Sequence, residues 1–149
     1  MLRQAIRSTR SGFSMVEIMV VLAIIGIMMS LVGPRVISML SRGKQTATTS
    51  TMATMKQALQ EYYNDIGHFP TKAEGGLNAL VSPPKNQALR KKWDGPYLEG
   101  QDELPEDGWG FPFEYYAPPR QKGKFRHFEI LSHGEEGPDG NSEEIVVGS

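Results

Sequence analysis

The sequence contains no cysteine and no excess of charge of either sign. Without cysteine the chain cannot form disulfides, Cys-ligated zinc sites, iron–sulfur clusters or a thiol nucleophile. A cysteine-free chain is compatible with oxidising and reducing compartments, so this absence assigns no location. The 16 Lys and Arg residues are balanced by 17 Asp and Glu residues, for a net charge of −1 over 149 residues. Nucleic-acid-binding proteins usually carry a basic excess, so we expect no nucleic-acid partner.

The residue patterns of common active sites are missing as well. His68, His127 and His133 do not have metal-ligand spacing. Ser132 lies beside His133, but adjacent positions on a strand point to opposite faces, which excludes a catalytic triad built on this pair. No glycine loop of the kind that cradles phosphate is present. These absences predict a protein that is not an enzyme.

An apolar run covers residues 13–33 and is interrupted only by Ser14, Glu17 and Ser30. A helix of this length covers roughly 30 Å, the thickness of a bilayer's hydrocarbon core. A buried core helix is the alternative, but a chain this small has no core large enough to surround it. We therefore expect a single membrane span. Three arginines and no acidic residue precede the run, so the positive-inside rule places the N-terminus in the cytoplasm and the remainder across the membrane.

A second helical pattern follows Pro34, a residue that removes one helical hydrogen bond and bends the axis. Over residues 34–66 the pattern is amphipathic, with apolar side chains recurring at spacings of three and four. This stripe consists of Met52, Met55, Leu59, Tyr62 and Ile66. It needs a partner surface, which predicts that this half of the helix packs on a folded head.

Residues 67–149 are punctuated by glycine and proline and form the predicted head. The patterns predict a short helix over 72–81 and an extended loop over 93–107. Strands are expected at 111–117, 124–131 and 145–147, where apolar and aromatic residues lie between turn signals. The expected fold class is α+β, with one long N-terminal helix laid on a small antiparallel sheet.

The segment G-F-S-M-V-E at 12–17 follows a short basic leader and opens the apolar run. A Sec-type signal would instead end in a small-x-small cleavage site after the run, and S-L-V-G-P-R is a poor one. The arrangement resembles the class III signal of type IV pilins and pseudopilins. The resemblance implies that a prepilin peptidase removes residues 1–12 by cutting between Gly12 and Phe13, and methylates the new amine of Phe13.

Glu17 is the single charge within the apolar run. A charge in a spanning helix costs about 2.5 to 3.5 kcal/mol on insertion scales. One interpretation is a carboxylate that snorkels to the cytoplasmic interface. The other is a pair with the N-terminal amine of Phe13 on a neighbouring subunit, a head-to-tail contact whose repetition builds an open filament. Gly26 and Gly33 permit close helix packing, and together with Pro34 they let the helix stretch inside such a filament.

The head narrows the resemblance to the major pseudopilin of type II secretion systems. Segments resembling the family's motifs are Y-Y-N-D-I-G-H-F-P-T, G-G-L-N-A-L-V, D-G-W-G-F-P-F-E-Y and F-E-I-L-S-H-G-E-E-G-P-D-G-N-S-E-E-I. The chain departs from the family pattern at two places. D-P-W-G is replaced by D-G-W-G at 107–110, and the terminal D-D is replaced by Glu143 and Glu144.

In that family the terminal loop binds calcium, and residues 135–144 of this chain are rich in oxygen donors. The resemblance implies ligands among the carbonyl of Leu131 and the side chains of Glu136, Asp139, Glu143 and Glu144. Alignment without gaps places the family's first aspartate on Glu136, whereas alignment on G-P-D-G places it on Asp139. A solvated acidic loop without metal is the alternative. In a head without disulfides, a bound calcium ion would take over the stabilising role of a crosslink.

The resemblance implies a structural subunit of the bacterial inner membrane, single-pass, with its head in the periplasm. It would polymerise into the pseudopilus that drives export of folded proteins across the outer membrane. The implied partners are further copies of the chain, minor pseudopilins, the inner-membrane assembly platform and the prepilin peptidase. Two alternatives remain open at this point: a type IV major pilin of a surface fibre, and a membrane-anchored calcium-binding module that does not polymerise.

Overall fold

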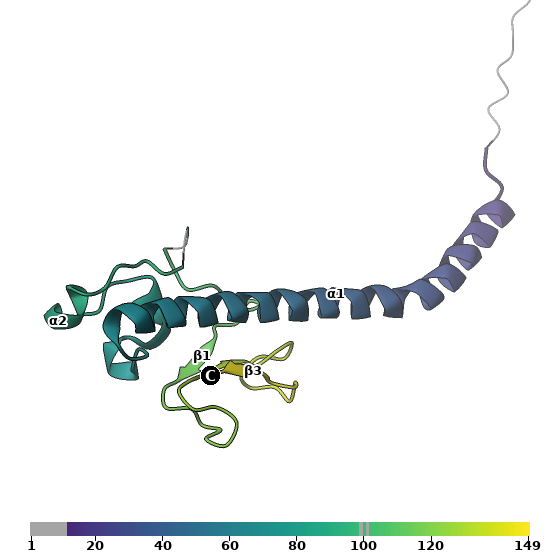
Figure 1. Cartoon of the computed structure of the whole chain (residues 1–149). Helices are drawn as coiled ribbons and strands as arrows, with labels where there is room; N and C mark the ends of the chain where they lie inside the picture. Colours follow the sequence, from purple (N-terminus) through teal and green to yellow (C-terminus); the bar gives the residue numbers. More distant parts are fainter. Residues whose placement is uncertain (1–11, 99, 101) are drawn as a thin grey trace, which may run out of the picture. The chain divides into compact units, whose positions relative to one another are not determined.

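The computed structural model describes residues 12–98, 100 and 102–149. Residues 1–11, nearly the whole of the predicted leader, lie outside the described residues. The elements, coloured along the chain in Figure 1, are α1 (Met15–Ile66), η1 (Lys72–Glu74), η2 (Gly76–Leu80), α2 (Gln87–Arg90), β1 (Glu114–Tyr116), β2 (Glu129–Ser132) and β3 (Ile145–Gly148). The predicted α+β class is confirmed.

Helix α1 contains Pro34 within its length, so the helical pattern that resumes after the proline belongs to the same element. By its contacts the chain divides into two units, one ending at Met39 and one beginning at Leu40. In the first unit the large apolar side chains are exposed, from Phe13 to Met39. An apolar helix without covering protein is stable only in lipid or against other apolar helices.

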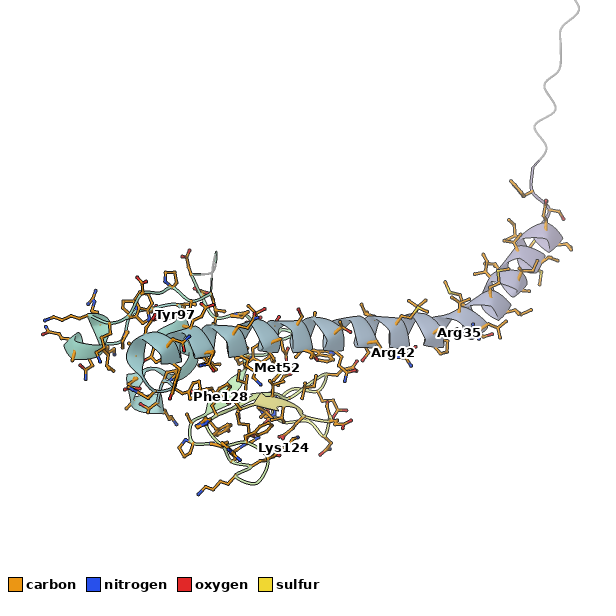
Figure 2. All side chains as sticks on the ribbon, in the orientation of Figure 1. Arg35, Arg42, Met52, Tyr97, Lys124 and Phe128 are labelled. Carbon is orange, nitrogen blue, oxygen red and sulfur yellow. The ribbon has the colours of Figure 1, made fainter. Side chains whose placement is uncertain are left out.

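The second unit has one core, built on the apolar stripe of α1. Met52, Met55, Leu59 and Tyr62 are 0% exposed and Ile66 is 5% exposed, which confirms the predicted stripe. They pack with Leu77, Leu80, Leu98, Phe128 and Ile130. Figure 2 marks Met52 and Phe128 where α1 lies against the head. Each large apolar side chain buried this way contributes about 1.5 to 3 kcal/mol, so the helix supplies much of the head's stability.

The three strands form one antiparallel sheet in the order β1-β2-β3. In its centre β2 pairs Ile130 with Tyr115 on one side and with Val147 on the other. Strands β1 and β2 are shorter than the predicted segments 111–117 and 124–131, whereas β3 extends one residue beyond the predicted 145–147. Pro112 has no N–H to donate and forms only an isolated bridge with Glu106. Lys124 and Phe125 donate instead to the carbonyl of Gln121, in a turn that precedes β2.

The predicted helix over 72–81 is wrong, because two glycines interrupt it. Gly75 and Gly76 have φ of 106° and 58°, a left-handed conformation that ends η1 before η2 begins. Helix α2 was not predicted. It is a single turn whose N-cap, Asn86, accepts a hydrogen bond from the N–H of Ala88 at 2.9 Å.

Candidate functional site

The first candidate site is the start of α1. Gly12 and Phe13 precede the helix, and the Phe13 side chain is 78% exposed. Glu17 lies in the first turn, where the positive end of the helix dipole favours a carboxylate. The sequence contains no basic residue between Glu17 and Arg35. In a chain that began at Phe13, as the predicted cleavage would leave it, the nearest cation along the chain would therefore be the amine of Phe13.

The segment that follows Glu17 fits a membrane. Within the described part of the chain, α1 is the one helix long and apolar enough to span a bilayer, and its apolar window is not buried by the protein. A Cβ added at Gly26 or Gly33 would meet nothing within 4 Å. Among the described residues, nothing packs against these two positions, and the predicted role of the glycines in close contact between copies stays a prediction.

A second cluster surrounds Asp107, which is 6% exposed. Its Oδ1 accepts hydrogen bonds from the N–H groups of Trp109 and Phe111, both at 2.9 Å. Its Oδ2 accepts a hydrogen bond from Ser132 Oγ at 2.6 Å. One buried carboxylate thus closes the turn that contains D-G-W-G and fastens it to the end of β2. Sequence reasoning noted the motif at 107–110 but did not find this partnership with Ser132.

Gly108, in the same turn, touches α1. Its N–H donates to Thr48 Oγ1 at 2.8 Å, and Thr48 is fully buried. A Cβ at Gly108 would lie 2.3 Å from the carbonyl oxygen of Lys44. This distance is shorter than a van der Waals contact, so only glycine lets the turn approach the helix backbone this closely.

The third candidate site is the acidic loop between β2 and β3. The loop is closed by its own hydrogen bonds: Glu136 N–H donates to Ser142 Oγ at 2.7 Å, and Asn141 N–H donates to Glu136 Oε2 at 2.6 Å. Gly134 and Gly137 adopt φ of 72° and 71°, which provide the turns. A further bond, from Ser41 Oγ to Glu135 Oε2 at 3.2 Å, ties the loop to α1.

The residues predicted to hold calcium do not gather around one point. Leu131 is fully buried and lies in the ladder opposite Glu114 and Val146. Glu136 is bonded within the loop, and Glu144 lies 3.6 Å from Arg120. Asp139 and Glu143 are exposed. Among the residues that the structure describes, no three Asp, Glu or His side chains are placed to hold a metal. The side chains as arranged do not fit a calcium ion, and calcium binding stays a prediction.

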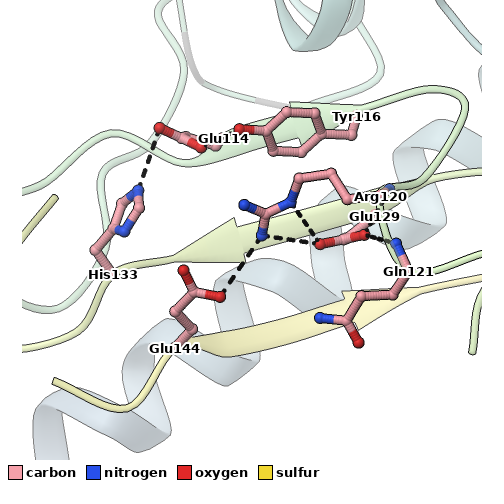
Figure 3. Close-up of polar contacts among 7 residues, drawn as sticks. All are labelled: Glu114, Tyr116, Arg120, Gln121, Glu129, His133 and Glu144. Atoms are coloured by element: carbon pink, nitrogen blue, oxygen red, sulfur yellow. Dashed lines mark hydrogen bonds and ion pairs between the residues drawn. The ribbon is translucent and has the colours of Figure 1, made fainter. Parts of the chain in front are cut away.

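Next to this loop lies a polar network that the sequence patterns did not indicate (Figure 3). Glu129, on β2, is 0% exposed. Its carboxylate accepts hydrogen bonds from Arg120 Nε, Arg120 Nη2 and the backbone N–H groups of Arg120 and Gln121, at 2.9 to 3.1 Å. The Arg120 guanidinium also lies 4.5 Å from the centroid of the Tyr116 ring. The cation links the β1–β2 loop to both strands.

Glu114 forms the other end of this network. It accepts a hydrogen bond from the Tyr116 hydroxyl, and its Oε1 lies 3.2 Å from His133 Nε2. The hydrogen bond from Tyr116 lowers the pKa of Glu114 below its ordinary value, and His133 and Arg120 act in the same direction, against burial, which raises it. The pair joins β1 to the loop that follows β2.

We predict from this lowered pKa that Glu114 stabilises the head above pH 4.5, its ordinary pKa, and loses this contribution as the pH falls through the folded-state pKa. At pH 7, Glu114→Gln is expected to lower the free energy of unfolding by about 1 kcal/mol or less, because the side chain is partly exposed. Thermal unfolding of both proteins between pH 7 and pH 3 measures the difference. A difference that grows as the pH falls would contradict the prediction.

Family models match almost the whole chain. The model of the prokaryotic N-terminal methylation motif matches residues 7–33, and the model of type II secretion system protein G matches residues 35–148. The type II secretion system core protein G of Pseudomonas aeruginosa is 38% identical, over 93% of this chain and 95% of the relative. That of Vibrio cholerae is 32% identical, over 91% of this chain and 90% of the relative.

A solved structure agrees with these relatives. The major pseudopilin from the type 2 secretion system of enterohaemorrhagic Escherichia coli matches with a TM-score of 0.55 and 27% identity, covering 70% of this chain and 86% of that one. The exposed apolar helix and the three-stranded head thus define a pilin-like protein. More narrowly, the chain belongs to the type II secretion system protein G family, the major pseudopilins, which are structural subunits of the type II secretion pseudopilus.

Proposed function

We propose that this chain is inserted in the inner membrane as a precursor, trimmed between Gly12 and Phe13, methylated at Phe13, and assembled into a pseudopilus through α1. The match of residues 7–33 to the N-terminal methylation motif supports the processing. The exposed apolar face of α1 supports the assembly, because in the filament this face would exchange lipid for the same face of other copies. The pseudopilus would then push folded proteins toward an outer-membrane channel.

The observation that carries this proposal is the position of Glu17, an acidic residue in the first turn of a helix that carries no other charge before Arg35. In a helix that serves only as a membrane anchor, a carboxylate at this position makes insertion less favourable and contributes no compensating interaction. Pairing with the amine of Phe13 on the next copy offsets this cost only after assembly. Methylation leaves the amine cationic, so the pair is compatible with the modification.

The orientation follows from the charges of the leader. Arg3, Arg7 and Arg10 favour a cytoplasmic N-terminus, which directs the head to the periplasm. The prepilin peptidase and the assembly platform would meet the chain at the inner membrane, and minor pseudopilins would join it in the filament. A non-polymerising membrane anchor with the same topology is the competing function, and assembly through Glu17 separates the two.

Processing is tested by the mass and N-terminal sequence of the full chain extracted from membranes of a strain with a type II secretion system. The expected chain begins at Phe13 and carries one methyl group. The variant Gly12→Val is expected to keep residues 1–12, because a branched side chain replaces the small residue before the cut. The variant Gly43→Val, at an open position on α1, should be processed like the wild type. An intact Met1 in the wild-type protein would overturn the proposal.

A further inference from the structure

Two of the four carboxylates on which the predicted calcium site would depend, Glu136 and Glu144, already have protein partners. Glu136 accepts the N–H of Asn141, while its own N–H donates to Ser142, so the turn between them is closed from both sides. The turn is also tightly packed, since a Cβ at Gly140 would lie 2.1 Å from the Cβ of Glu136. Turning the Glu136 carboxylate toward a metal would leave the Asn141 N–H without this bond.

Glu144, directly before β3, has a different partner. Its Oε2 lies 3.6 Å from Arg120 Nη2, the nitrogen that also donates to Glu129 Oε1 at 3.0 Å. Figure 3 shows the guanidinium between these two carboxylates. Glu129 is completely buried and cannot be solvated, so the arginine is held in place by the stronger of its two ion pairs.

The Arg120 side chain therefore contacts two strands of the sheet and the residue that precedes the third. It lies over Tyr116 of β1, binds Glu129 of β2 and pairs with Glu144, directly before β3. A divalent cation bound through Glu144 would lie close to this positive charge and be repelled by it. Calcium also needs six to eight oxygen ligands, and two of the candidate carboxylates are engaged elsewhere.

We propose that Arg120 is the cation that holds the end of the acidic loop against the sheet, so that the head folds without calcium. This inference goes beyond the proposed function and applies whether or not the chain polymerises. It also gives a role to the glutamate at position 144, whose carboxylate lies 3.6 Å from the guanidinium, whereas nothing in the structure explains the glutamate at position 143.

The test uses the full chain in detergent and follows thermal unfolding by near-UV circular dichroism, with either a chelator or millimolar calcium chloride. The two wild-type curves are expected to coincide. The variant Arg120→Gln leaves Glu129 buried without its cation and is expected to lower the midpoint by several degrees in both solutions. Its matched control is Arg126→Gln, at an exposed position on the same connection between β1 and β2, with an expected shift near zero.

Two results would overturn the inference. One is a wild-type midpoint that rises by several degrees with calcium, which would instead support a calcium site in the loop. The other is an Arg120→Gln midpoint equal to that of Arg126→Gln. If Arg120→Gln does not fold, Glu144→Gln replaces it, because this variant removes the loop carboxylate that pairs with Arg120 and leaves the buried pair with Glu129 intact. A lowered, calcium-insensitive midpoint then supports the inference, and an unchanged or calcium-dependent midpoint overturns it.

Discussion

Replacement of Glu17 by alanine is expected to abolish pseudopilus assembly and secretion while leaving membrane insertion intact. The alanine helix enters the bilayer at least as readily, because a charge costing about 2.5 to 3.5 kcal/mol at the helix centre is removed. Under the proposed function, the variant would lose the partner for the Phe13 amine of the next copy, and with it the contact that would set the axial register. Crosslinking of membrane fractions, electron microscopy of filaments and the amount of an exported protein in the medium measure the outcome.

Glu17→Gln keeps the size of the side chain and removes only its charge, so it should fail like alanine. Glu61→Gln is the matched control, since this glutamate is exposed on the same helix outside the apolar run. Normal secretion by Glu17→Ala would exclude the pairing role and favour a carboxylate that only snorkels to the interface. Normal filaments without secretion would instead place the role of Glu17 after assembly.

The second large effect is expected at Gly108, where alanine should destabilise the head by about 1 to 3 kcal/mol. The added Cβ would lie 2.3 Å from the Lys44 carbonyl oxygen, so the turn must move away from α1. That movement lengthens the hydrogen bond from the Gly108 N–H to Thr48, whose hydroxyl is buried. Thermal unfolding of the full chain in detergent measures the change.

Gly123→Ala is the control for this prediction, because a Cβ there meets nothing within 4 Å. Thr48→Val removes the acceptor without adding bulk at the turn and should cost about 1 to 3 kcal/mol, since the Gly108 N–H is left without its partner. Equal midpoints for Gly108→Ala and Gly123→Ala would show that the close approach of turn and helix is not needed for stability.

The turn at Gly108, as it packs on α1, could not accommodate the proline of the D-P-W-G pattern. Proline at position 108 would have no N–H to donate to Thr48, and its ring would occupy the space beside Lys44. The glycine and the threonine are 60 positions apart, and each is unremarkable alone. Their coupling becomes visible only when α1 is placed against the turn.

Much of the fold could be predicted from local pattern. Helical spacing alone decides which side chains of a helix share a face, so it predicted the apolar run and the stripe from Met52 to Ile66. The motif at 12–17 was recognised from its residue order. Strand positions were approximately right, but their ends were not. The missing N–H of Pro112 shortens β1, and the turn in which Lys124 and Phe125 donate to the Gln121 carbonyl shortens β2.

The sequence by itself determined the position of the apolar helix, of the carboxylate Glu17 within it and of the amphipathic stripe. These features follow from the chemistry and spacing of neighbouring residues on one helix. Only the tertiary structure decided which cation meets which carboxylate. In the sequence, nothing distinguishes Glu129 and Glu144 from the other acidic residues, which number 17 in all. In the structure, both carboxylates lie beside Arg120. Such pairs join elements distant in sequence, and their energy depends on burial and distance, which composition and spacing do not contain.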